Sequence, residues 1–294
     1  MSLFQGAGVA IVTPFTEEKR VNYDELGRLI EFQIAKEIDA IVVCGTTGEP
    51  STMTEEERIS VIEYTIDKVK KRVPVIAGSG GNCTDSVTAF SKNAAKLGVD
   101  GLLVVTPYYN KATQKGLYEH YAVVAKNVEC PIVMYNVPSR TGVNLLPGTA
   151  AKLGKEIEHI VALKEASGNI SQVAEVISKA EGALDIYSGN DDQIVPILSL
   201  GGVGVISVLA NIAPKEVHEI VKLYLDGNIS EAKDLQLTYL ELIKEIFSEV
   251  NPIPVKKALA FMGFQTNTLR LPLTEMEPKN QERLMCAMKN IGII

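Results

Sequence analysis

Eight short apolar segments recur along the first 208 residues, and helical spacing or helix-start signals follow each of them. The segments are runs of Val, Ile, Ala and Leu without polar alternation, which is typical of parallel strands covered on both faces. We place the strands at residues 7–12, 40–44, 73–77, 101–105, 132–135, 160–163, 184–187 and 204–208. Eight strand–helix units predict an α/β fold, a (β/α)8 TIM barrel.

A doubly wound open sheet is the alternative architecture. In its dinucleotide-binding form, G-x-G-x-x-G follows a strand. The glycine-rich turn at residues 78–81, Gly-Ser-Gly-Gly, follows a predicted strand but lacks that spacing. The pattern therefore favours the barrel and gives the dinucleotide-binding version little support.

The strand pattern stops after about Gly227. We predict one long amphipathic helix over residues 230–249, a break at Pro252 and Pro254, and two further helices over residues 255–262 and 278–290. The chain is therefore divided into a catalytic barrel, residues 1–226, and a C-terminal helical appendage, residues 227–294.

Composition excludes several classes of function. The net charge is -7, and no local cluster of Lys and Arg reverses it, so we expect no general attraction for nucleic acid or anionic membranes. No apolar run approaches membrane-spanning length, and residues 1–8 lack a signal-peptide pattern. We expect a cytoplasmic protein.

The cysteines and histidines give no metal-binding pattern. No C-x-x-C pair occurs among the four cysteines, which fits reduced thiols in a cytoplasm. The three histidines lie in or beside predicted helices and pair with no obvious ligand; they are His120, His159 and His218. We therefore expect neither a metal nor a cofactor.

Lys164 stands at the end of the apolar run 160–163, in the stretch Val-Ala-Leu-Lys-Glu-Ala-Ser-Gly. Desolvation disfavours the ammonium form of a buried lysine, and a neutral amine can attack a carbonyl to form a Schiff base. Taken alone, this stretch fits an ordinary strand-end lysine better. The residues that follow the other strands change this assessment.

The active site of a TIM barrel lies at the carboxyl ends of its strands, in the loops that follow them. The residues with suitable chemistry at those positions are Thr46, Thr47, Tyr109, Tyr135, Arg140, Lys164 and Gly189. A lysine captures a carbonyl, a phenol moves protons, and an arginine grips a carboxylate with two hydrogen bonds. Together they predict carbonyl chemistry on an anionic substrate.

Three motifs in combination resemble the dihydrodipicolinate (4-hydroxy-tetrahydrodipicolinate) synthase family. They are G-T-T-G-E at residues 45–49, Y-N-V-P-S-R-T-G at 135–142, and A-L-K-E-A-S-G at 162–168. The resemblance runs nearly the full length, to P-V-K-K-A at 254–258 and L-R-L-P at 269–272. This family belongs to the pyruvate-dependent class I aldolases, which include N-acetylneuraminate lyase.

The resemblance implies a lyase that condenses pyruvate with L-aspartate 4-semialdehyde in lysine and diaminopimelate biosynthesis. Lys164 matches the Schiff-base lysine, and Tyr135 matches the phenol that shuttles protons. The resemblance also assigns Thr47 and Tyr109 to the proton relay of that tyrosine. It implies that Thr46 and Thr47 bind the carboxylate of pyruvate and that Arg140 binds the carboxylate of the semialdehyde. Gly189 and Ile206 match positions that line the pyruvate pocket. In this family the tyrosine at position 109 reaches the neighbouring subunit's site, which implies a homo-oligomer, either a dimer or a tetramer.

Feedback inhibition by lysine is a second property of many relatives. Their lysine site uses a histidine or similar group early in the helix after G-T-T-G-E, an asparagine, a glutamate four residues after that asparagine, and the first tyrosine of a Tyr-Tyr pair. Asn82 and Tyr108 match this pattern, but Ser86 stands at the glutamate position, and Glu55 and Arg58 stand at the early-helix positions. A missing charge-assisted hydrogen bond is worth about 1.5–3 kcal/mol, so weak or no feedback is predicted.

Other functions remain open at this point. A sialic acid lyase of the same superfamily usually carries Ser-Thr in the turn and lacks the arginine at position 140, so the sequence favours the synthase. A metal-dependent aldolase needs clustered ligands. A barrel that only binds a keto acid is compatible with the fold, but it has no need for a nucleophilic amine beside a phenol.

Overall fold

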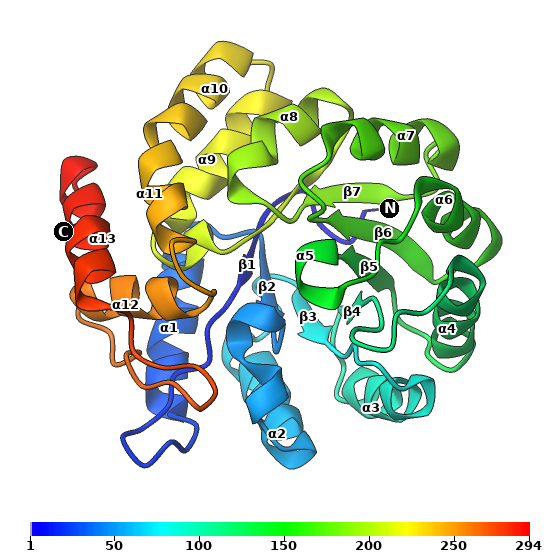
Figure 1. The fold of residues 1–294 in the computed structure, drawn as a ribbon, viewed down its shortest axis with the longest axis horizontal. Helices are drawn as coiled ribbons and strands as arrows, with labels where there is room; N and C mark the ends of the chain where they lie inside the picture. The colour runs from blue at the N-terminus through cyan, green and yellow to red at the C-terminus, as the bar shows by residue number, and fades with distance from the viewer. Residues whose placement is uncertain (1) are drawn as a thin grey trace.

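The structure, a computed structural model, describes residues 2–294 and is built around a closed barrel of eight parallel strands (Figure 1). The strands pair in chain order, and the barrel closes where β1 pairs with β8. They are β1 (Gly6–Ala10), β2 (Ala40–Val43), β3 (Val75–Gly78), β4 (Gly101–Val105), β5 (Ile132–Asn136), β6 (Ile160–Glu165), β7 (Asp185–Ser188) and β8 (Gly204–Ser207). The predicted TIM barrel is confirmed, and the open sheet is excluded. Met1, the first residue of the predicted barrel segment, lies outside the described residues.

Helices surround the barrel and connect its strands (Figure 1). The α-helices of this part are α1 (Tyr23–Ala35), α2 (Glu55–Val69), α3 (Thr84–Lys96), α4 (Gln114–Lys126), α5 (Pro138–Thr141), α6 (Pro147–Glu156), α7 (Ile170–Ala180), α8 (Ile194–Ser199) and α9 (Pro214–Leu225). The start of α2 illustrates how the sequence determines the beginning of a helix. The Thr54 hydroxyl accepts from the Glu57 N–H, and the Glu57 carboxylate accepts from the Thr54 N–H, a reciprocal cap of the helix N-terminus.

The strands contribute to two hydrophobic layers. Alternate residues of each strand face the barrel interior, as Ala40 and Val42 do in β2, while Ile41 and Val43 belong to the layer beneath the helices. Tyr135 and Tyr187 lie in the inner layer. Lys164 is in register with both tyrosines, so its side chain also starts from the inner face.

The closure of the barrel depends on two glycines. Gly6 of β1 pairs with Gly204 of β8, and a Cβ atom added to Gly204 would collide with the carbonyl oxygen of Gly6. Only a residue without a side chain lets the first and last strands approach this closely. The Phe4 ring stacks on Tyr187 with 4.4 Å between centroids, and it lies in the same inner layer.

The C-terminal region consists of α10 (Ile229–Thr238), α11 (Leu240–Ile246), α12 (Ile253–Phe261) and α13 (Pro278–Asn290). The prediction of one long helix over residues 230–249 is wrong, because the helix is interrupted at Tyr239. The two halves pack on different partners: α10 lies on α9 and α8, and α11 lies on α12 and α13. The Gln236 side chain holds α10 to the first turn of α8 through the Val195 N–H and to the turn before α8 through the Asp192 carbonyl.

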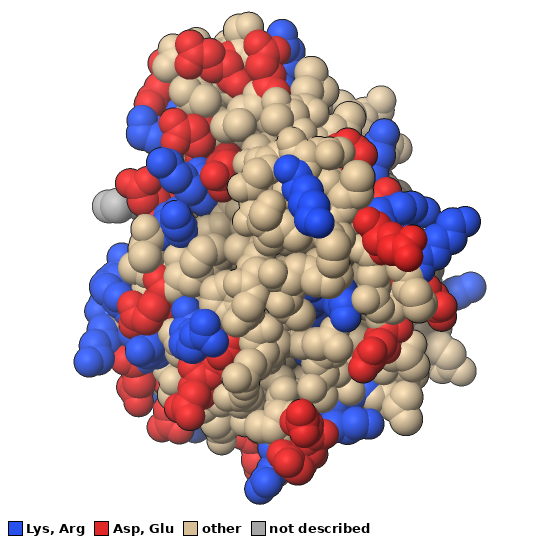
Figure 2. Space-filling view, turned by 90° about the vertical axis from the view of Figure 1, so that its left-hand side faces the viewer, with Lys and Arg blue, Asp and Glu red and all other residues tan. Residues whose placement is uncertain are grey.

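We propose residue 227 as the start of a C-terminal appendage. In Figure 1 its last helices lie along one side of the barrel, and an ion pair of 2.9 Å between Glu245 and Arg283 joins α11 to α13. Figure 2 shows this side of the molecule, where charged side chains of both signs are interspersed around a central region with few charged atoms. Within residues 2–294, no helix combines the length and hydropathy needed to cross a membrane.

Candidate active site

Lys164 lies inside the carboxyl end of the barrel. Strand β6 continues beyond the predicted end at residue 163 and includes Lys164 and Glu165. The side chain of Lys164 is buried, and its Nζ atom lies 4.4 Å from the centroid of the Tyr135 ring. The strand register thus places the amine and the phenol of the predicted site side by side.

Burial lowers the pKa of Lys164 to about 8. The nearby Asp191 carboxylate opposes this shift, and the Arg140 guanidinium adds to it. Because the ordinary lysine pKa is near 10.4, the lowered value gives a much larger fraction of neutral, nucleophilic amine near neutral pH. The predicted desolvation of the strand-end lysine is therefore found in the structure.

Tyr135 is buried beside the amine. Burial raises the pKa of the Tyr135 phenol, and Arg140 and a hydrogen bond with Thr46 oppose that shift. The phenol therefore keeps its proton near neutral pH and can donate it to an oxygen that leaves a neighbouring carbon.

The threonines of the G-T-T-G-E turn have different partners. They lie in the single turn of 3-10 helix Thr46–Gly48 that follows β2. Thr46 lines the central cavity and is the threonine whose side chain lowers the pKa of Tyr135, whereas the Thr47 hydroxyl accepts a hydrogen bond of 2.9 Å from Nδ2 of Asn251. Because Thr46 shares the cavity wall with Tyr135 and Thr47 is bonded to Asn251, the arrangement favours Thr46 as the relay partner of Tyr135.

Arg140 stands at the mouth on α5, which follows β5. Its side chain is exposed, lines the central cavity, and donates through Nη2 to the backbone carbonyl of Asn251 over 3.4 Å. The segment that carries it is anchored by the Asn136 side chain, which bonds to Asn144 and to the buried Glu165 carboxylate. The guanidinium is thus free to bind an anion while its backbone is held in place.

The central cavity joins three of the predicted site residues, whereas Lys164 and Thr47 are not among the residues that line it. Thr46, Tyr135 and Arg140 line it together with Arg58 and Tyr108. Further residues of the wall include Gly45, Pro50, Leu103, Val105 and Val137. A second cavity adjoins the loops after β5, β6 and β7, where Phe247 and three residues of α11, Leu240, Ile243 and Lys244, form part of its wall.

Gly189 and Ile206 occupy the predicted positions near the amine. A Cβ atom on Gly189 would stand 3.2 Å from Cε of Lys164 and 2.6 Å from Cβ of Ala166, so a side chain at position 189 would crowd the lysine. Ile206 is fully buried in the inner layer of the barrel.

Tyr109 does not join the other predicted residues within one chain. Its side chain is 89% exposed, and its backbone has a φ of 73°. The Tyr109 N–H bonds to the Thr141 carbonyl over 3.3 Å, which ties this loop to the segment that carries Arg140. The large exposed ring agrees with a role outside its own barrel.

Sequence reasoning missed two residues at this site. Asp191 follows β7, and its buried carboxylate accepts hydrogen bonds from the Ser207 hydroxyl and from the N–H groups of Val208 and Leu209. Its place in a loop after a strand was a usable signal. Asn251 directly precedes the proline break at Pro252, and no local pattern indicates its contact with Thr47, 204 positions earlier.

Two of the three histidines have structural partners. His120 bonds through Nδ1 to the Thr84 hydroxyl, and His218 bonds through Nδ1 to Asp39. Across residues 2–294, no group of three or more His, Cys, Asp or Glu side chains is arranged to hold a metal ion.

Comparisons with known proteins give one consistent family. The sequence model of the dihydrodipicolinate synthetase family matches residues 3–291. A 4-hydroxy-tetrahydrodipicolinate synthase from Lachnoclostridium phytofermentans is 58% identical over 294 residues and covers 100% of both chains. One from Caldicellulosiruptor bescii is 57% identical over 293 residues, with 100% of this chain and 99% of the relative covered.

Solved structures agree with the sequence matches. Dihydrodipicolinate synthase from Thermotoga maritima superposes with a TM-score of 0.98 at 42% identity and covers 100% of both chains. A chloride-inhibited dihydrodipicolinate synthase from Acinetobacter baumannii, in complex with pyruvate, has a TM-score of 0.97 at 43% identity and covers 99% of both chains.

Proposed function

The chain belongs to the dihydrodipicolinate synthetase family, and we propose that it is a 4-hydroxy-tetrahydrodipicolinate synthase that joins pyruvate to L-aspartate 4-semialdehyde through a Schiff base on Lys164. The enzyme is a class I aldolase-type lyase of lysine and diaminopimelate biosynthesis. The observation that carries this proposal is the buried Lys164 amine, with a pKa of about 8, beside the Tyr135 phenol. The pyruvate complex of the Acinetobacter baumannii relative supports pyruvate as one substrate.

The first half of the reaction forms an enamine. Neutral Lys164 attacks the keto carbon of pyruvate to give a carbinolamine, and Tyr135 donates a proton to the hydroxyl that leaves as water. The resulting iminium loses a methyl proton and becomes an enamine. Thr46 passes protons to and from Tyr135, and hydroxyl and N–H groups of the Thr46–Thr47 turn hold the pyruvate carboxylate.

The second half joins the two substrates. The enamine carbon attacks the aldehyde carbon of the semialdehyde, whose carboxylate is held by Arg140 at the mouth. The amino group of the semialdehyde then attacks the imine carbon, closes the ring and expels Lys164. Tyr109 completes the proton relay in the neighbouring subunit's site, so the active protein is a homo-oligomer.

An activity assay separates this function from that of a related lyase. Purified protein is expected to consume pyruvate only when L-aspartate 4-semialdehyde is present, and to leave N-acetylneuraminate uncleaved. Arg140 provides the reason, because a guanidinium at the mouth suits the carboxylate of a small amino-acid aldehyde. Cleavage of N-acetylneuraminate without condensation would favour the lyase, and loss of condensation activity with a chelator would favour the metal-dependent aldolase.

Lysine feedback on this enzyme is weak or absent. The cavity wall beside Tyr108 carries the Arg58 guanidinium, which lies 3.7 Å from the centroid of the Phe90 ring and donates to the Gly78 carbonyl over 3.1 Å. A fixed positive charge there repels the ammonium groups of lysine, and Ser86 supplies no carboxylate to offset it. A steady-state assay with added lysine tests the prediction of weak feedback. Half-inhibition below about 1 mM lysine, which corresponds to a binding free energy of about -4.1 kcal/mol, would contradict it.

A further inference from the structure

Asn251 lies in the segment between α11 and α12 and contacts both carboxylate-binding elements of the proposed site. Its side-chain Nδ2 donates to Oγ1 of Thr47 over 2.9 Å, and its backbone carbonyl accepts from Nη2 of Arg140 over 3.4 Å. The residue is only 5% exposed. One residue of the C-terminal appendage therefore touches the turn and the arginine that hold the two substrates.

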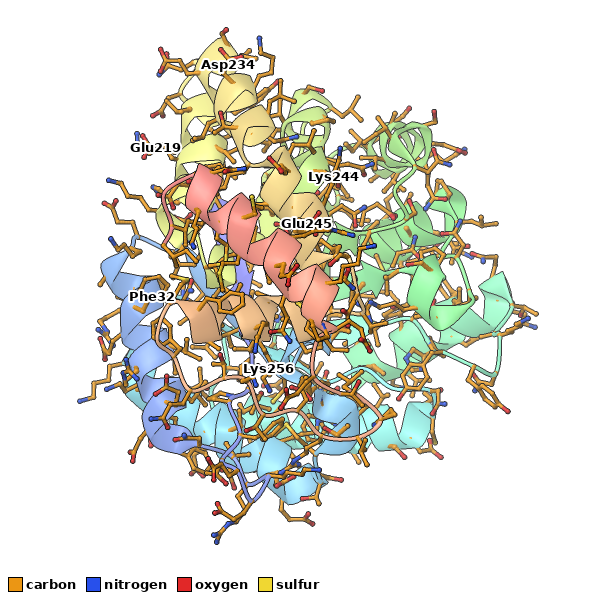
Figure 3. All side chains as sticks on the ribbon, turned by 60° about the vertical axis from the view of Figure 1, so that its left-hand side comes forward. Phe32, Glu219, Asp234, Lys244, Glu245 and Lys256 are labelled. Atoms are coloured by element: carbon orange, nitrogen blue, oxygen red, sulfur yellow. The ribbon has the colours of Figure 1, made fainter. Side chains whose placement is uncertain are left out.

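A buried ion pair just beyond Asn251 fixes this segment to the same turn. Nζ of Lys256 on α12, labelled in Figure 3, lies 2.6 Å from Oε1 of Glu49, the residue that ends the G-T-T-G-E turn. The same Nζ donates to the carbonyls of Thr13 and Thr268 over 3.0 and 2.7 Å. Three partners satisfy the three donors of the ammonium, so the start of α12 is held against the turn.

The contact with Asn251 determines which hydrogen bond Thr47 can donate. A threonine hydroxyl has one proton and two acceptor lone pairs. Because the Asn251 amide donates to Oγ1, it occupies a lone pair and leaves the Thr47 proton available for another acceptor. The amide thus offers Thr47 its donor side, and the Oδ1 atom of Asn251 is buried without a partner among the described residues.

We infer that Asn251 is a positioning residue that keeps the Thr47 hydroxyl oriented as a hydrogen-bond donor toward the pyruvate carboxylate. This role deepens the proposed function and rests on it. Asn251 does not touch the reacting atoms, and it acts only through Thr47. Its backbone contact with Arg140 is independent of the side chain and is kept when the side chain is replaced.

Asn251→Asp is the most direct test, because it keeps the shape and replaces the donor by an acceptor. The Thr47 proton is then drawn to the introduced carboxylate and away from pyruvate. Loss of a hydrogen bond to a charged group predicts an increase of about 10- to 100-fold in the pyruvate concentration at half-maximal imine formation. Asn251→Leu removes the donor without adding charge, and we expect an increase of about 3- to 10-fold.

Two controls separate this role from a general effect. Asn228→Asp adds the same charge at the exposed N-cap of α10, where aspartate is as good a cap as asparagine, and we expect unchanged pyruvate dependence. In a Thr47→Val background no hydroxyl remains to be oriented, so adding Asn251→Asp is expected to change the pyruvate dependence by less than about twofold. Thermal unfolding of each variant establishes that it is folded.

The outcomes distinguish this inference from the proposed function. Imine formation is measured by borohydride trapping and mass spectrometry across a pyruvate titration. Unchanged pyruvate dependence in Asn251→Asp, or in Asn251→Leu if the aspartate variant does not fold, overturns the role of Asn251. A full loss that persists in the Thr47→Val background also overturns it, because charge repulsion would then be the cause. No trapping in the wild-type protein would instead contradict the proposed function.

Discussion

At the scale of the residue, the pKa values of two neighbouring side chains, Lys164 and Tyr135, are shifted in opposite directions, and each shift suits the role proposed for its residue. Burial lowers the pKa of the Lys164 amine and raises the pKa of the Tyr135 phenol, so one group becomes a nucleophile while the other keeps its proton. Both shifts have the same main cause, because burial disfavours the charged form of either group. Both side chains are buried because both lie on the inner face of the barrel.

The protonation state of the Lys164 amine determines how the rate of imine formation depends on pH. Below a pKa of about 8 the amine is mostly charged, so the single-turnover rate of imine formation is expected to rise about tenfold per pH unit and to level off above the pKa. Rapid quenching with borohydride at a series of pH values measures this rate. A rate that keeps rising up to about pH 10 would show that Lys164 titrates as an ordinary exposed lysine.

The role of the phenol is tested by Tyr135→Phe. We expect turnover to fall by about 10²- to 10⁴-fold, the usual contribution of a proton-transfer group, while the unfolding temperature changes little. Tyr118→Phe is a matched control, because Tyr118 lies on α4, donates its hydroxyl proton to Glu156 and is not among the residues that line the cavity. Equal turnover in Tyr135→Phe and the wild type would remove Tyr135 from the mechanism.

The sequence identified most of the site at this scale. Residues at the carboxyl ends of strands or just after them, such as Lys164 and Arg140, could be found because a TIM barrel brings strand ends together. The different roles of Thr46 and Thr47 could not be predicted, because they depend on the direction in which each hydroxyl points from a three-residue turn. Asn251 was also out of reach, because its contact is tertiary and no local pattern indicates it.

At the scale of the element, the start of α12 is part of the mouth of the barrel. The Glu49–Lys256 pair is fully buried and joins the turn after β2 to the C-terminal region. A buried pair contributes little net stability compared with an apolar substitute, but removal of one partner leaves an uncompensated charge. The pair therefore makes the position of the turn depend on α12.

Lys256→Met tests this dependence. The substitution leaves Glu49 buried without a cation, and we expect the free energy of unfolding to fall by about 3–5 kcal/mol. Lys257→Met is the matched control, because Lys257 is partly exposed and its Nζ atom lies 5.5 Å from the centroid of the Phe261 ring. We expect this substitution to change the free energy of unfolding by less than about 1 kcal/mol. Denaturant unfolding measures both, and equal stability of the two variants would contradict the account.

The elements themselves were largely predictable. All eight strands lie within a few residues of the predicted limits, because uninterrupted apolar runs mark strands buried on both faces. The break at Tyr239 was not predictable from periodicity, because residues 230–249 are compatible with one continuous helix. It arises where α10 and α11 pack on different neighbours.

At the scale of the whole molecule, one chain contains an incomplete version of the proposed site. Tyr135, Thr46 and Arg140 share one cavity wall and Lys164 lies beside Tyr135, whereas Tyr109 is 89% exposed. The sequence could assign Tyr109 to a partner's site only through the family resemblance, because no pattern within one chain shows what lies outside it.

Hybrid oligomers test this arrangement. Lys164→Ala and Tyr109→Phe are each expected to lower activity strongly when pure, the first because it removes the amine and the second because it removes a relay hydroxyl. After unfolding and refolding together, a mixed dimer contains one site with both native residues, so about a quarter of wild-type activity is expected. Recovery no greater than the sum of the separate variants would place Tyr109 outside the neighbouring site.

The central claim is that Lys164 forms the covalent link to pyruvate. Mass spectrometry with peptide mapping, after treatment with pyruvate and borohydride, tests this claim most directly, and Lys256 serves as an internal reference because it is also buried but pairs with Glu49. The account predicts a reduced pyruvyl adduct on Lys164 and none on Lys256. Absence of the adduct from a folded sample, or its presence on another lysine, would contradict the Schiff-base assignment.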